Sequence, residues 1–151
     1  MKNGYDLSDL PQLMAGLLEG ERDAVANMAN ASALLFDAVP DINWAGFYLR
    51  KGDCLVLGPF QGKPACVRLP LSKGVCAAAA QRDQVVVVPD VHLFAGHIAC
   101  DSASRSEIVF PLHREGEVFA VLDIDSPVLD RFAPIVDLLA ATAAVIERSM
   151  Q

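Results

Sequence analysis

The chain has 151 residues, of which 53% are hydrophobic and 21% charged, enough apolar material for one folded core and too much for a disordered chain. Its 19 acidic residues outnumber the 12 basic ones, for a formal net charge of -7, so a phosphate-bearing partner would meet mostly like charge. We therefore expect a single domain over residues 1–151 that binds neither nucleic acid nor an anionic membrane, and whose ligand is a small molecule or a protein.

Two features of the sequence bear on its compartment. The start, MKNGYDLSDL, has no apolar stretch behind Lys2 and is unlike a secretory signal, and the apolar runs at residues 75–80 and 138–146 are shorter than the roughly 18 residues that span a bilayer. We expect a cytoplasmic protein. In a reducing cytosol its four cysteines are not expected to form a permanent disulfide framework, which leaves core packing, metal binding and redox chemistry as their roles.

The first third of the chain changes from a helical to a strand-like pattern. Leucine and methionine recur at helical spacing over residues 8–36 with a break at Gly20, which predicts one helix and then a longer one from near Glu21. From Ile42 apolar residues alternate, and a turn at residues 51–53 leads into a second alternating run, which predicts a β-hairpin.

The middle of the chain mixes short elements with irregular segments. Residues 58–65 predict a loop, residues 66–71 a short strand, and Gly74 the start of an alanine-rich helix that ends near Arg82. The four valines at residues 85–88 predict a short buried strand. Beyond Pro89 the sequence shows neither a helical nor a strand period until Ser106, and so long a connection inside a compact domain is usually functional.

The last third of the chain predicts a second hairpin and a closing helix. Residues 107–113 and 118–125 are the strands, turning at 114–117, and residues 131–150 form an amphipathic helix with Pro134 in its first turn. We expect an α+β fold in which four or five antiparallel strands carry the N- and C-terminal helices on one face. The apolar stripes of these helices are also compatible with a homodimer.

The irregular segment combines a cysteine with imidazole and carboxylate side chains: His92, His97, Cys100, Asp101 and Glu107. One interpretation is a surface loop with a packed cysteine. A second is a metal site, because His97 and Cys100 are three residues apart and Cys66 or Cys76 is available, although no C-x₂-C pair is present. Redox chemistry at Cys100 is the third.

Carboxylates and aromatic residues gather on the predicted strands. Asp123 and Asp125 alternate with apolar residues and so share one face of their strand, and Glu107 opens the neighbouring strand. On an inner face they would need a ligand, whereas on an outer face they would be ordinary solvated charges. Trp44 and Tyr48 fall on one side of the first strand, either in the core or as an aromatic wall beside the carboxylates.

These residues stand in five longer motifs: NWAGFYL (43–49), QGKPAC (61–66), KGVC (73–76), DVHLFAGHIACDSASRSEIV (90–109) and VLDIDSP (121–127). Together the motifs resemble the free methionine-(R)-sulfoxide reductase family, which consists of single-domain enzymes of the GAF fold. The resemblance runs from about residue 20 to residue 148. It is specific, because GHIACDSASRSEIV is far longer than a chance match and regulatory GAF domains generally lack it.

The resemblance implies an activity and its redox residues. The family reduces free methionine (R)-sulfoxide to methionine with electrons from thioredoxin, which implies a function under oxidative stress and needs no metal or organic cofactor. By motif position Cys100 would be the catalytic cysteine and Cys66 the resolving one, with Cys76 as a third family cysteine. Cys54 lies outside the motifs and is treated as a bystander.

The resemblance also implies the substrate pocket, in loops on the sheet face opposite the terminal helices. Glu107, Asp123 and Asp125 would line it, one as proton donor and the ionised ones as ligands of the substrate ammonium, and Trp44 and Tyr48 would face the methyl group and side chain. Two alternatives from other classes are a GAF-type sensor of a small ligand and a redox-sensing or zinc-binding regulator.

Overall fold

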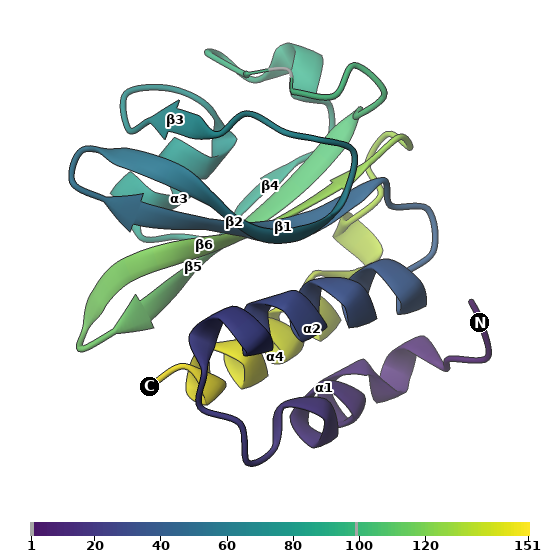
Figure 1. Cartoon of the computed structure of the whole chain (residues 1–151). Helices are drawn as coiled ribbons and strands as arrows, with labels where there is room; N and C mark the ends of the chain where they lie inside the picture. Colours follow the sequence, from purple (N-terminus) through teal and green to yellow (C-terminus); the bar gives the residue numbers. More distant parts are fainter. Residues whose placement is uncertain (1, 99) are drawn as a thin grey trace.

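The computed structural model describes residues 2–98 and 100–151, which form one antiparallel sheet of six strands in the order β3-β2-β1-β6-β5-β4 (Figure 1). The strands are β1 Trp44–Lys51, β2 Cys54–Gly62, β3 Arg68–Pro70, β4 Val86–Val88, β5 Ser106–Arg114 and β6 Glu117–Ser126. The predicted α+β class and both hairpins are confirmed, and the sheet has six strands where four or five were predicted.

Helices cover both faces of this sheet. The helices are α1 Leu10–Leu18, α2 Ala24–Ala38, α3 Val75–Arg82 and α4 Val136–Ser149. In Figure 1, α2 and α4 lie against one face with α1 packed on them from outside, whereas α3 lies on the opposite face. The N- and C-terminal helices therefore share one face, as predicted. None of the helices among the described residues is long and apolar enough to cross a membrane.

Two helices begin later in the chain than the sequence pattern suggested. The side chain of Asp23 caps α2 by accepting a hydrogen bond from the amide of Ala26 (2.9 Å), so the helix begins at Ala24. Pro134 lies in a 3₁₀ turn, η3 Ala133–Ile135, and α4 begins only after it. Further 3₁₀ turns occur at η1 Leu7–Asp9 and η2 Val91–Leu93.

The predicted loop at residues 58–65 is wrong in its first part, because residues 58–62 continue β2. Gly58, Pro59 and Gly62 suggested that the strand ends, but pairing with β1 keeps these residues in β2. Residues Cys54 to Val56 pair with β3, so Pro59 lies beyond the paired part of that edge, where a missing donor is tolerated. Gly46 on β1 is needed for this approach, since a Cβ there would lie 2.3 Å from Cβ of Phe60.

Strand alternation divides the interior into two clusters. On β6, Leu122 and Ile124 join the cluster between the sheet and the helices α1, α2 and α4. Val121 points to the other face, where Trp44 and Tyr48 pack with residues of α3 in a second cluster. The second cluster borders the predicted site.

Candidate active site

The cysteine of the irregular segment is joined to a distant part of the chain. Cys100 forms a disulfide with Cys66, 34 residues earlier, with their Cα atoms 5.8 Å apart. Cys54 and Cys76 are free thiols. The bond is consistent with the redox interpretation of Cys100. It also leaves neither sulfur of the pair as a thiolate ligand for the alternative metal site with His97.

A cavity of about 50 Å³ lies beside this disulfide, between α3 and the face of the sheet that α3 covers. The predicted site residues that line it are Trp44, Tyr48, Cys76, His97, Cys100, Asp101, Glu107, Asp123 and Asp125. Cys66 and His92 are not among the lining residues, although Cys66 is bonded to Cys100. Sequence reasoning missed Lys63, Lys73 and Ser104, which also line it. The two lysines stand inside the QGKPAC and KGVC motifs, which was the available signal.

Trp44 and Tyr48 belong to the buried core and also form one wall of the cavity. Trp44 and Tyr48 are buried and stack with centroids 6.0 Å apart, while Phe60 stacks on Trp44 at 5.2 Å. Their polar atoms hold the segment that contains Cys66: Trp44 Nε1 donates to the carbonyl of Lys63 (3.2 Å), and the Tyr48 hydroxyl donates to that of Cys66 (2.8 Å). The aromatic wall thus positions one end of the disulfide.

The segment that follows Cys100 is held to the start of β1. Asn43 Nδ2 donates hydrogen bonds to Asp101 Oδ2 and to Ser104 Oγ, both at 3.1 Å. Asp101 Oδ1 accepts from the amide of Ala103 (2.9 Å), and the amide of Arg105 donates to the carbonyl of Ser126 (2.7 Å). Asn43 was missed as a site residue, although it opens the NWAGFYL motif.

The carboxylates lie on the covered face of the sheet rather than in solvent. Glu107 is paired directly with Asp125 across β5 and β6, and Asp123 is paired with Val109 two residues along, so all three side chains share one face. Glu107 is 7% exposed and Asp123 5%. Of the two placements that the alternation left open, the inner one is correct.

Burial and mutual repulsion control how these acids ionise. Burial, and then the neighbouring carboxylates, raise the pKa of Glu107 and of Asp125 well above the ordinary carboxyl range. Burial also raises the pKa of Asp123. Because the three groups titrate as a coupled unit, the cluster keeps a proton to higher pH than an isolated acid does.

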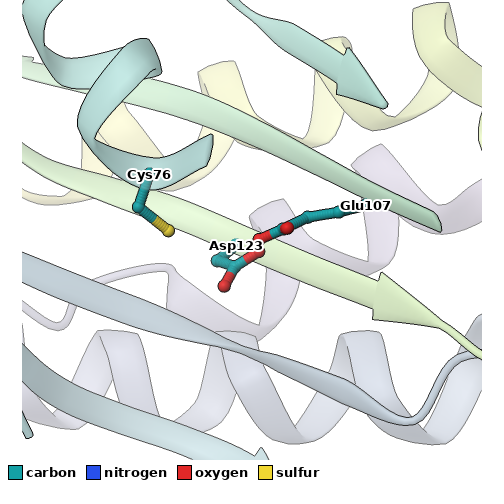
Figure 2. Close-up of side chains that lie close together, drawn as sticks. All are labelled: Cys76, Glu107 and Asp123. Carbon is teal, nitrogen blue, oxygen red and sulfur yellow. The ribbon is translucent and has the colours of Figure 1, made fainter. Parts of the chain in front are cut away.

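Cys76 completes this cluster from α3. Figure 2 shows its sulfur directed toward the carboxylates of Asp123 and Glu107, and one ligand atom from each of the three residues lies within 4.8 Å of the others. Burial, and then the charges of Asp123 and Glu107, raise the pKa of the Cys76 thiol well above its ordinary value. A thiol that stays protonated is a weak nucleophile.

His97 does not fit the role of a cationic activator. Burial, and then the charge of His92, lower the pKa of His97, so its imidazole is mainly neutral at neutral pH. Its Nε2 lies 3.9 Å from Glu107 Oε1. His97 therefore carries little positive charge at neutral pH with which to promote ionisation of Cys100.

Replacing Asp123 with Asn should stabilise the protein, and more so at high pH. A carboxyl whose pKa is raised on folding costs stability as pH rises above its unfolded value, near 4, because the folded protein then releases the proton less readily than the unfolded chain does. We expect urea unfolding with the disulfide intact to give a gain that is larger at pH 8 than at pH 5, by on the order of 1 kcal/mol. The exposed Asp53→Asn is the control, and equal gains at both pH values would contradict this account.

Comparison with known proteins relates this geometry to a family. Residues 14–149 match the GAF domain family. The free methionine-R-sulfoxide reductase of Escherichia coli (strain K12) is 56% identical over 125 residues, which cover 83% of this chain and 76% of that protein. The reduced form of fRMsr of Staphylococcus aureus superposes with a TM-score of 0.93 at 45% identity, covering 100% of this chain and 99% of that one. Free methionine-R-sulfoxide reductase from Neisseria meningitidis, in complex with its substrate, superposes with a TM-score of 0.90 at 39% identity, covering 99% and 93%.

Proposed function

We infer a mechanism from the premise that this chain belongs to the free methionine-R-sulfoxide reductase family, within the larger GAF domain family. We propose that it reduces free L-methionine (R)-S-oxide to L-methionine in the cavity beside Cys100. The observation that carries the proposal is the Cys66–Cys100 disulfide at a pocket lined by buried, proton-retaining carboxyls. This arrangement joins a two-electron redox pair to an acid and a cation-binding site.

The first step oxidises Cys100 and reduces the substrate. The Cys100 thiolate attacks the sulfoxide sulfur, and the oxygen takes a proton from a carboxyl of the cluster as it is transferred to the cysteine. Methionine leaves with its sulfur reduced by two electrons, and Cys100 becomes a sulfenic acid. Raised carboxyl pKa values support this step, because an acid must still be protonated where a thiol begins to ionise.

The second step forms the disulfide. The Cys66 thiol attacks the Cys100 sulfenic acid, the S–S bond forms, and water leaves. Cys66 is the better resolving candidate because it lies within bonding distance of Cys100, whereas the Cys76 thiol is buried with a raised pKa. A thioredoxin-type dithiol then supplies two electrons by disulfide exchange, without a metal or organic cofactor.

Recognition of the free amino acid follows from charge. Those carboxylates of Glu107, Asp123 and Asp125 that are ionised bind the substrate ammonium, and the stacked rings of Trp44 and Tyr48 contact its apolar end. A residue inside a peptide has no ammonium to offer. The pocket therefore favours the free amino acid.

The activity is tested by incubating the protein with racemic methionine sulfoxide, thioredoxin, thioredoxin reductase and NADPH. We expect consumption to stop when half of the substrate is gone, because one sulfoxide epimer is accepted. A ligand sensor would consume none, and consumption of all of the substrate would contradict the stereospecificity.

Replacing Cys66 with serine should separate attack from resolution. Because attack on the sulfoxide precedes disulfide formation, the reduced variant should form about one methionine per protein without reductant and then cycle slowly or not at all with thioredoxin. The measurement is methionine formed per protein by chromatography, with Cys54→Ser as the matched control. Normal thioredoxin-dependent cycling of the variant would identify Cys76 as the resolving residue instead.

The pH dependence of the methionine-forming step should be a bell. Rates rise as Cys100 ionises and fall as the donor carboxyl, whose pKa is raised by burial and neighbouring charge, loses its proton. Single-turnover profiles of Glu107→Gln, Asp123→Asn and Asp125→Asn should show the falling limb flattened and the rate lowered for whichever residue donates. If all three keep both limbs and a near-normal rate, none of these carboxyls is the donor.

A further inference from the structure

One buried nucleophile has no part in the proposed reaction. Cys76 is 4% exposed and is a free thiol, and its sulfur converges with carboxylate oxygens of Glu107 and Asp123 (Figure 2). The three residues come from three elements, α3, β5 and β6, so the tertiary fold brings them together. Their candidate ligand atoms all lie within 4.8 Å of one another.

A second observation points to a cation at this place. Asp123 is 5% exposed, and within residues 2–98 and 100–151 its Oδ1 atom is buried without a hydrogen-bond partner. A carboxylate oxygen in this position carries a desolvation cost that no hydrogen bond from the described residues offsets. The residue also lines the cavity, so a small cation in the cavity would lie next to the Asp123 side chain.

We propose that Cys76, Glu107 and Asp123 form an inhibitory binding site for a divalent metal ion of the zinc class. Zinc accepts sulfur and carboxylate oxygen together, at about 2.3 Å and 2.0–2.2 Å, and binds three protein ligands with a fourth position open. Magnesium and calcium take oxygen ligands and gain nothing from a thiolate. When the metal binds, the thiol proton and any carboxyl proton leave to solvent.

Inhibition, but not binding, rests on the proposed function. The metal would hold the same carboxylates that bind the substrate ammonium, so metal and substrate exclude one another. Cys76 adds the selectivity, because a thiolate ligand favours zinc over the harder cations. The structure thus assigns Cys76 a function in metal inhibition.

The binding test uses the whole protein with its Cys66–Cys100 disulfide intact, since that bond removes both redox thiols as ligands. Co²⁺ is the probe, and a near-ultraviolet sulfur-to-cobalt charge-transfer band reports a thiolate ligand. We expect the band in the parent protein, its loss on adding one equivalent of Zn²⁺, and its absence in Cys76→Ser. Cys54→Ser, which removes the other free thiol at the start of β2, is the matched control and should keep the band.

A competition titration with a chromophoric zinc chelator measures affinity, and Cys76→Ser should weaken Zn²⁺ binding by about 100-fold or more. Glu107→Gln gives a second test should Cys76→Ser misfold: its cobalt band should persist, with weaker binding. No band in the parent, a band that survives Cys76→Ser, or unchanged Zn²⁺ affinity in both variants would overturn the site.

A kinetic arm tests the inhibition. Zn²⁺ should slow single-turnover methionine formation by the prereduced parent in competition with substrate, and Cys76→Ser should need about 100-fold more Zn²⁺ for the same effect. Inhibition that is equal in both proteins would overturn the inhibitory role. If the parent forms no methionine even without metal, the proposed reaction fails while the binding result stands.

Discussion

Replacing Cys100 with serine should abolish methionine formation and leave the fold intact. A thiolate is the group that attacks the sulfoxide sulfur, and a serine hydroxyl at neutral pH is almost fully protonated and cannot form the sulfenic acid that the next step needs. Cys100 is 34 residues from its partner and lies in an irregular segment outside both core clusters. Losing the disulfide should therefore lower stability by a few kcal/mol without preventing folding.

The measurement is single-turnover methionine formation by the prereduced protein, where recycling plays no part. We expect no methionine above the uncatalysed background for Cys100→Ser, and about one per protein for the control Cys54→Ser, whose thiol lies on the hairpin turn near Lys51. Circular dichroism establishes that both variants fold. Appreciable methionine formation by folded Cys100→Ser would refute its assignment as nucleophile.

N-acetylation of the substrate should cause a large loss of kcat/KM. The acetyl group removes the ammonium charge, so any carboxylate of the cluster that is ionised stays buried without a counter-charge in the complex. Breaking a buried charge pair costs about 3–5 kcal/mol, which corresponds to a loss of about 100-fold or more in kcat/KM. Peptide-bound methionine sulfoxide should react poorly for the same reason.

A variant makes this comparison specific. Asp123→Asn should lower the rate with the free amino acid more than the rate with the N-acetyl compound, because only the free amino acid has an ammonium that the removed charge attracts. Both rates are measured with the (R)-sulfoxides by chromatography. Equal kcat/KM for free and acetylated substrates in the parent protein would place the carboxylates outside the recognition site.

Much of the fold follows from local patterns. The period of two in residues 118–125 places Asp123 and Asp125 on one face whatever the strand packs against, and the same holds for Trp44 and Tyr48 on β1. The start of β2 could be predicted, because it follows a local turn that contains Gly52. The continuation of β2 through Pro59 could not, because it depends on pairing with β1, where Gly46 leaves room for Phe60.

The motifs identified more of the candidate site than the composition did. Cys66, Cys76 and Cys100 were each singled out by motif position. In the structure Cys76 and Cys100 line one pocket, and Cys66 is bonded to Cys100. Spacing along the chain left metal and redox roles open for Cys100. Lys63, Lys73 and Asn43 were missed because single polar residues within a motif carry no periodic signal.

By itself, the sequence determined the α+β class, the pairing of hairpins and the shared face of each set of site residues, because these depend on periodicity and turns between neighbouring residues. The tertiary structure alone decided which face is covered. Once α3 lies over the side with Glu107 and Asp123, burial raises their pKa values and turns three ordinary acids into a proton-retaining cluster. Desolvation depends on what the rest of the chain places above a residue, and no local pattern encodes it.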